Sequence, residues 1–110
     1  MDSAREPTRY LALAVILRAV NDMRRHGAKN TTAQTDQEHH DAIVWLGSAR
    51  ASVWFDGAHV SQLEALRANN WMTHAQELLK GRKLDANQRE VLERGVEVFG
   101  MLEARDGKGL

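Results

Sequence analysis

The sequence predicts an all-α protein, a compact bundle of five or six helices that includes a helix-turn-helix-like segment. Apolar residues recur at helical spacing along most of the chain, and almost no stretch alternates apolar and polar side chains as a strand would. The one proline is at position 7, and several glycines stand where helices could end. With 43% hydrophobic and 27% charged residues, residues 1–110 are expected to form a single globular domain. We expect loose termini at residues 1–6 and 105–110.

The first helix is expected to begin at Pro7, whose missing amide proton is harmless in a first turn, and to end near His26 and Gly27. It is apolar on so much of its circumference that we place it at the centre of the core, covered from several sides. The core predicted for the whole chain is Leu13, Ile16, Leu17, Val20, Ile43, Leu46, Trp54, Leu66, Val98 and Phe99. A polar loop follows the first helix at residues 29–34 and is the best candidate for a mobile segment.

The next two helices are predicted from capping residues and glycines. Thr35 and Glu38 have the spacing of a capping box, and Gly47 ends the helix that they open. Ser48 caps a short third helix with an apolar stripe, which the pair Asp56-Gly57 is expected to break. The stripe consists of Ala51, Trp54, Phe55 and Ala58.

Ser61 caps a fourth helix. Residues 62–80 form either one helix or two, and the sequence leaves both alternatives open. Asp85 caps the final helix, which contains two glycines, Gly95 and Gly100. A glycine inside a helix costs about 1 kcal/mol relative to alanine, so we expect another backbone to approach both positions closely.

Residues 41–67 have the outline of a helix-turn-helix, in which a short helix is followed by a glycine-containing turn and a capped helix. If the fourth helix reads duplex DNA, its polar residues are of the types that reach base edges or phosphates. These candidates are Ser61, Gln62, Arg67, Asn69 and Asn70, with further phosphate contacts from the basic cluster Lys80, Arg82 and Lys83. The formal net charge of zero and the acidic Glu64 argue against DNA binding. A plain helical corner is an equally weighted alternative.

The three tryptophans are assigned to two roles. Trp45 and Trp54 have apolar neighbours, so we assign both to the core. Trp71 stands beside the polar pair Asn69-Asn70, and buried tryptophans often anchor protein interfaces. Trp71 and the adjacent Met72 are therefore the candidates for contact with a protein partner.

No residue is assigned a catalytic, cofactor-binding or metal-binding role, and an enzyme is not expected. His39 and His40 are adjacent, so on a helix they point about 100° apart and cannot readily share one metal ion. We expect these histidines to be solvated or to cap a helix. The absence of cysteine excludes disulfides and thiolate metal sites. The apolar run at residues 10–17 is too short to cross a bilayer, so no membrane partner is expected.

One segment resembles a known group of proteins. The string Ala42-Ile43-Val44-Trp45-Leu46-Gly47-Ser48, followed by Trp54, Ala58, Leu63 and Leu66-Arg67, is similar to a pattern in small bacteriophage and prophage proteins. That pattern reads approximately A-x-x-W-L-x-S, then an aromatic residue, a glycine-containing turn and an L-R pair. Most of these proteins have no assigned function. The resemblance implies a mobile-element origin and a location in the cytoplasm of a bacterial host, although this chain departs from the pattern at its turn.

Two classes of function follow from these observations. In the first, the protein is a small phage or mobile-element regulator that binds duplex DNA through its helix-turn-helix-like segment. In the alternative, it is a protein-binding module or inhibitor that sequesters a host or phage protein without contacting DNA. The apolar stripe of the final helix could also pair with a second copy to form a homodimer, or fold back on the first helix.

Overall fold

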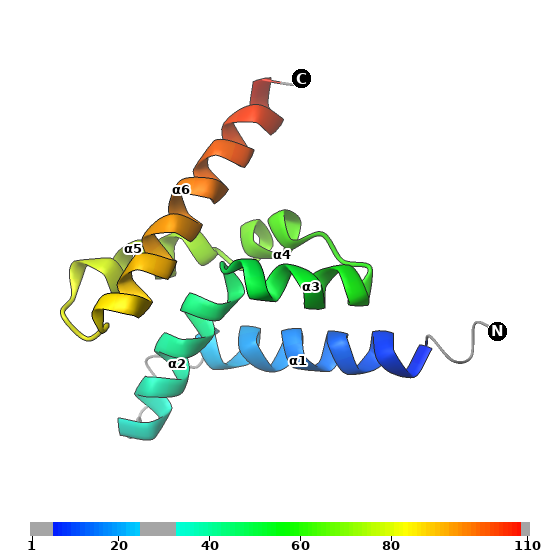
Figure 1. The fold of residues 1–110 in the computed structure, drawn as a ribbon, viewed down its shortest axis with the longest axis horizontal. Helices are drawn as coiled ribbons and strands as arrows, with labels where there is room; N and C mark the ends of the chain where they lie inside the picture. The colour runs from blue at the N-terminus through cyan, green and yellow to red at the C-terminus, as the bar shows by residue number, and fades with distance from the viewer. Residues whose placement is uncertain (1–5, 25–32, 109–110) are drawn as a thin grey trace.

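Six α-helices make up the part of the chain that the computed structural model describes, which is residues 6–24 and 33–108, and these residues contain no strand. The helices are α1 (Glu6–Arg24), α2 (Ala33–Leu46), α3 (Ala49–Ala58), α4 (Gln62–Ala68), α5 (Trp71–Lys80) and α6 (Ala86–Lys108). Figure 1 shows α1 and α3 lying side by side, while the C-terminal half of α6 extends away from the other helices. The predicted all-α bundle is confirmed.

Helix α2, and not α1, is the central element of the fold. It contacts α1, α3, α5 and α6, whereas α1 packs mainly against α2 and α3. Ala12, Ile16 and Met23 of α1 are buried, but Leu17 on the opposite face is 53% exposed. The prediction that the first helix lies at the centre of the core is wrong because, among the described helices, its contacts are mainly with α2 and α3.

Some of the other predicted core residues are buried, and others are exposed. Ile43, Leu46, Leu66 and Phe99 are buried, as is Ile16, and Leu13 and Val20 are partly buried against the core. Trp45 also packs against the core. Trp54 and Val98 are 37% and 49% exposed, so their assignment to the core is wrong. In each helix the next residue, Phe55 in α3 and Phe99 in α6, points about 100° away and is the one that is buried.

Capping side chains begin three helices as predicted. Each side-chain oxygen accepts a hydrogen bond from an amide three residues later, which satisfies one of the free amides of the first turn. The pairs are Ser48 with Ala51 (3.3 Å), Ser61 with Glu64 (3.2 Å) and Asp85 with Gln88 (2.7 Å).

Other predicted boundaries differ from the structure. Helix α2 begins at Ala33, so Thr35 lies inside its first turn and not at its cap. Helix α3 continues past Asp56-Gly57 to Ala58, because the left-handed residue that ends it is His59 (φ 58°). Helix α6 continues to Lys108, so residues 105–108 are not a loose terminus. The predicted end of the first helix and residues 29–32 of the predicted polar loop lie outside the described residues.

Residues 62–80 form two helices. Asn70 adopts a left-handed conformation (φ 55°), which turns the chain between α4 and α5. The side-chain amide of Asn69 donates to the carbonyl oxygen of Ala65 (2.8 Å) and satisfies an acceptor at the end of α4. The first residue of α5, Trp71, is thereby directed into the core.

Trp71 is fully buried and packs on the corner where α2 meets α3. Its indole nitrogen donates to the carbonyl oxygen of Ile43 (2.8 Å). Its ring lies over Gly47, where an added Cβ would overlap the ring atom Cζ2, and beside Phe99, with 5.5 Å between ring centroids. The prediction that Trp71 contacts a protein partner is therefore wrong. Its polar neighbours lie in the turn, and Trp71 itself is on the inner face of α5.

The two glycines of α6 have different environments. A Cβ added at Gly95 would lie 2.8 Å from the carbonyl oxygen of Gly47, so the backbone of α6 crosses the α2–α3 corner in close contact. A Cβ added at Gly100 would meet no atom within 4 Å among the described residues. The expected close approach of another backbone is confirmed at Gly95 and wrong at Gly100.

We expect Ile16→Ala to lower the free energy of unfolding by about 2–5 kcal/mol, because it opens a cavity in a buried site. Leu17→Ala is the matched control on the exposed face of α1, and its cost should stay below about 1 kcal/mol. Urea denaturation followed by circular dichroism measures both values. Equal costs for the two variants would contradict the described orientation of α1.

Gly95→Ala and Gly100→Ala should change stability in opposite directions. The first places a methyl group against a backbone carbonyl and should destabilise the protein. The second adds a methyl group in open space and should stabilise the helix by about 0.5–1 kcal/mol, since alanine has the higher helix propensity. Thermal denaturation of both variants beside the wild type compares them, and stabilisation by Gly95→Ala would contradict the described corner.

Candidate functional site

An open cavity of about 610 Å³ lies between the start of α3, helix α4 and one face of α6, and we call it the α3–α4–α6 groove. Leu63 and Leu66 of α4 line one side of it. Helix α6 supplies the other side with Val91, Val98 and Leu102. A volume of this size with a mostly apolar lining is typical of binding sites in proteins.

The corner between α2 and α3 holds both walls of the groove in place. The side-chain amide of Gln62, the first residue of α4, donates to the carbonyl oxygens of Leu46 (2.9 Å) and Ser48 (3.2 Å). Gly95 brings α6 against the same corner. Farther along α6, the guanidinium of Arg67 donates to Glu103 (3.3 Å) and connects the two walls again. The groove is thus fixed at the α2–α3 corner, and the exposed Arg67–Glu103 pair adds a weaker contact farther along α6.

Four residues of α6 that line the groove form a seam, which consists of Val91, Gly95, Val98 and Leu102. They are spaced by four, three and four residues, the spacing of a coiled-coil seam that packs along another helix. Val98 is 49% exposed and Leu102 is 42% exposed, and the adjacent Met101 is also exposed. The described residues therefore leave part of this seam uncovered.

Charged residues at the edge of the groove have both signs. Arg50 comes from the first turn of α3, and Glu90 and Arg94 come from α6. Glu90 and Arg94 approach each other to 3.8 Å, and both side chains are highly exposed. An exposed pair of this kind contributes little to stability, so both groups remain available to a ligand.

The residues predicted to read DNA are largely engaged within the fold. Ser61 caps α4, Gln62 holds the α2–α3 corner, and Asn69 bonds to the backbone of its own helix. Arg67 is exposed but paired with Glu103, and Asn70 is exposed in the turn before α5. The outer face of α4 also includes the exposed acidic residue Glu64. This face therefore combines groups of both signs and is not a basic surface.

The basic cluster predicted to contact phosphates lies elsewhere. Lys80 is the last residue of α5, and Arg82 and Lys83 lie in the connection from α5 to α6. The cluster is therefore at the end of α5 that is distant from α4 (Figure 1). Lys83 forms an ion pair with Asp36 (3.0 Å), and Lys80 is 3.5 Å from Glu77. The structure does not combine this cluster with α4 in one surface. Met72, the second residue predicted to contact a protein, is partly buried against the core.

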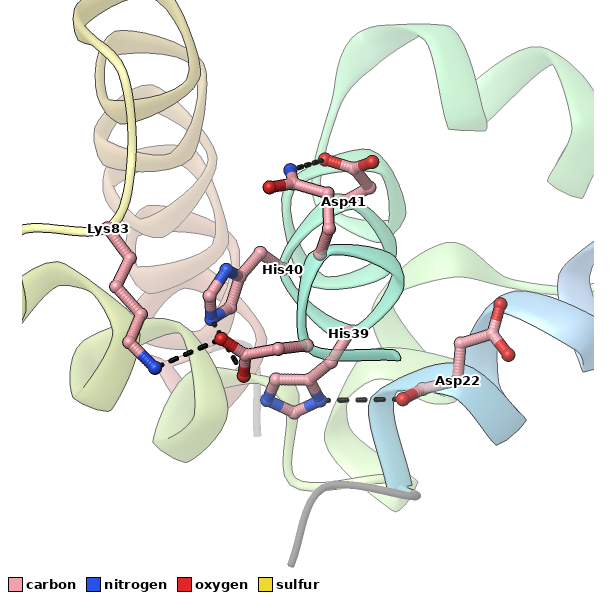
Figure 2. Close-up of polar contacts among 7 residues, drawn as sticks. Asp22, His39, His40, Asp41 and Lys83 are labelled. Carbon is pink, nitrogen blue, oxygen red and sulfur yellow. Dashed lines mark hydrogen bonds and ion pairs between the residues drawn. The ribbon is translucent and has the colours of Figure 1, made fainter. Parts of the chain in front are cut away.

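His39 and His40 are buried within α2, contrary to the expectation that they are solvated or cap a helix. Figure 2 shows them at the junction of α1, α2 and the α5–α6 connection. His40 Nε2 lies 3.6 Å from Asp36, whose other carboxylate oxygen pairs with Lys83. His39 Nδ1 lies 3.4 Å from the carbonyl oxygen of Asp22 in α1 (Figure 2). These contacts join three parts of the fold.

The ring of His74 in α5 lies 6.1 Å from that of His39, so three histidines gather near this junction. Among the described residues, no group of three or more histidine, aspartate or glutamate side chains is arranged to hold a metal ion. Sequence reasoning missed the burial of His39 and His40, although a signal was present. Each precedes a buried apolar residue, Ile43 or Val44, by four positions and so shares its face of α2.

Comparison of the chain with protein-family models, curated proteins and solved structures finds no match. The similarity of residues 42–67 to small phage proteins therefore stays a prediction. No helix within residues 6–24 and 33–108 is both long enough and apolar enough to cross a membrane.

Replacing Gln62 tests whether its side chain serves the fold. Gln62→Ala should lower the free energy of unfolding by about 1–3 kcal/mol, because it removes the donor to two partly buried carbonyl oxygens. Gln76→Ala, at an exposed position of α5, is the matched control and should change stability by less than about 0.5 kcal/mol. Urea denaturation measures both. If Gln62→Ala left the free energy of unfolding unchanged, the Gln62 side chain would not be needed for the fold and would again be a candidate for contact with a ligand.

Proposed function

We propose that this protein is a protein-binding module that takes an apolar helix of another protein into the α3–α4–α6 groove. The observation that carries the proposal is the groove itself, whose apolar walls are held together at the α2–α3 corner while its α6 seam is partly exposed. Grooves of this kind bind amphipathic helices through apolar side chains at positions i, i+3 or i+4, and i+7. The spacing of the α6 seam matches that pattern.

The chemistry of the groove favours such a ligand in two ways. Its apolar lining gains free energy when a partner's side chains displace water from it, at roughly 25 cal/mol for each Å² of apolar surface buried. Arg50, Glu90 and Arg94 at the edge can pair with charges flanking the apolar face of the partner helix. Such pairs at the edge of an interface favour one orientation of the ligand over the other.

The distribution of charge also supports a protein ligand. Lysine and arginine together number 15, as do aspartate and glutamate, so the formal net charge is zero. Binding to the phosphate backbone of DNA depends on a local excess of positive charge, and α4 does not provide one. In this proposal the protein acts as a regulator or inhibitor that sequesters its partner. The similarity to phage proteins supports a mobile-element origin, with the partner in a bacterial cytoplasm.

DNA binding is the second candidate, and one observation favours it. Helices α3 and α4 are separated by residues 59–61, the turn length of a helix-turn-helix. Arg67 and Asn70 are the two predicted DNA contacts in or just after α4 that are exposed, and Arg67 would have to leave its pair with Glu103 to contact a phosphate. Binding of duplex fragments that weakens with salt, with a log–log slope reduced by about one unit in Arg67→Ala, would favour this candidate.

The proposal is tested with a library of helical peptides that have leucine at positions i, i+4 and i+7. We expect some of these peptides to bind the wild type, and Val98→Glu to weaken their binding about tenfold or more, because it places a charge in the apolar groove. Ala104→Glu is the matched control, since it adds the same charge at an exposed position of α6 outside the groove. Circular dichroism verifies that both variants are folded.

Two results would contradict the proposal. One is that no peptide binds the wild type. The other is that both variants bind the peptides as well as the wild type does, because binding would then occur away from the groove.

A further inference from the structure

We propose that the junction of His39, His40 and His74 is a pH-sensitive contact, which holds α5 and the α5–α6 connection against α2 at neutral pH and weakens below about pH 6. Histidine is the side chain that ordinarily changes its charge near neutral pH, so histidines gathered between two helices make the contact of those helices depend on pH. None of the three histidines lines the α3–α4–α6 groove, and the proposal is therefore independent of the proposed function.

The first observation is the burial of the two histidines of α2. His39 is 6% exposed and His40 is 4% exposed, and they are the buried polar side chains of the part of the chain that the structure describes. A protonated imidazole at such a site loses most of its hydration, and burial therefore disfavours the charged form. Partners of opposite charge are needed to compensate for that loss.

The second observation is that the nearest carboxylate has a cationic partner already. One oxygen of Asp36 lies 3.6 Å from His40 Nε2, and the other pairs with Lys83 Nζ at 3.0 Å (Figure 2). A proton on His40 therefore leaves these three side chains with a net positive charge. The ring centroid of His39 lies 5.8 Å from that of His40 and 6.1 Å from that of His74, so each further proton repels the first at short range.

The carboxylates on the α1 side of α2 have other surroundings. Figure 2 shows the side chain of Asp22 directed away from His39, so that only the backbone carbonyl of Asp22 faces the ring. Asp22, Glu38 and Arg18 line a separate shallow cavity between α1 and α2. Asp41 accepts hydrogen bonds from two glutamine side chains (2.8 Å each). By sequence, residues 25–35 contain two cationic residues and one histidine but no aspartate or glutamate.

The charged groups of α5 and α6 near this side of the fold have partners of their own. Glu77 pairs with Lys80 (3.5 Å) at an exposed position of α5. Asp85 caps α6, and Arg89 of α6 donates to the carbonyl oxygens of Leu79 (3.0 Å) and Gly81 (2.6 Å). Protons added to the three histidines are therefore balanced mainly by Asp36, which Lys83 shares.

The effect on stability follows from the number of protons that each state binds. In the unfolded chain, each of the three histidines takes up a proton near pH 6.5, approximately the value for an isolated histidine. In the folded chain, burial and mutual repulsion keep the number of bound protons lower. Stability falls with falling pH wherever the unfolded state binds more protons than the folded state. The contact is thus strongest above about pH 7.5 and weakens as the pH falls through about 6.5.

The added charges act across the contact between α2 and α5. His39 and His40 belong to α2, His74 belongs to α5, and Lys83 follows α5 in the connection to α6. Helix α5 has ten residues, and a helix of that length is marginal in water without packing. Acid should therefore loosen α5 and the α5–α6 connection from α2.

Thermal denaturation at pH 7.5 and pH 5.5 tests the proposal. We expect the melting temperature of the wild type to be lower at pH 5.5 by about 5–15 °C. His40→Gln keeps a donor near the Nε2 position but cannot be protonated, so it should reduce this difference by at least about half. The control His59→Asn removes an exposed histidine from a left-handed position that asparagine tolerates, and it should keep the wild-type difference. An unchanged wild-type melting temperature, or equal differences in the two variants, would overturn the proposal.

Lys83→Gln tests the charge balance without altering a buried residue, since the Lys83 side chain is 60% exposed. Without the lysine, Asp36 can balance a proton on His40, so the melting temperature should depend less on pH than in the wild type. The matched control is Lys80→Gln, which removes an exposed lysine that pairs with Glu77, and it should behave as the wild type does. A dependence on pH that is unchanged or steeper in Lys83→Gln would overturn the proposal, even if His40→Gln did not fold.

Discussion

The structure depends on the seating of Trp71 at the corner between α2 and α3. The indole is fully buried, donates to the carbonyl of Ile43 and lies flush over Gly47. Because Trp71 begins α5 and its ring also packs on Phe99 of α6, this one side chain joins α2, α5 and α6. A buried aromatic residue contributes a large apolar area, and its hydrogen bond fixes where the ring sits. The contacts at this corner therefore determine where α5 and α6 lie.

The groove is a consequence of the same corner. Gly95 allows α6 to cross the carbonyl of Gly47, and the Gln62 amide binds α4 to the carbonyls on either side of that glycine. Both helices are thus anchored to a single point, and beyond it α6 extends away from the body (Figure 1). A space with apolar walls remains between them. The candidate site is therefore built from rigid helices and not from loops, which favours a preformed site for a helical ligand.

The sequence predicted the local features of the fold well and the long-range ones poorly. The caps at Ser48, Ser61 and Asp85 and the end of α2 before Gly47 depend on residues within one turn, so their patterns are visible in the chain. The face that a helix buries depends on distant neighbours. Leu17 and Ile16 are both apolar residues of α1, and only the packing of α2 and α3 decides which of them is buried. Trp71 was misassigned for the same reason, since its sequence neighbours form a turn.

The candidate site was visible only in part from the sequence. The apolar stripe of the final helix was evident, and Gly95 indicated a close contact. Val98 and Leu102 line a groove, and not the core, because of where α4 lies. The sequence did not predict the position of α4, since residues 62–80 could form either one helix or two.

The contact among Gly47, Trp71 and Gly95 has a consequence for how this sequence can evolve. No larger residue fits at positions 47 and 95, because the Trp71 ring and the carbonyl of Gly47 already fill the space that its side chain would need. A larger residue at position 47 would fit only if position 71 became smaller, and the loss of the ring would remove the pressure to keep a glycine at position 47. In homologous chains, substitutions at positions 47 and 71 should therefore covary. The glycine and the tryptophan should be kept or lost together, even where the residues that line the groove differ.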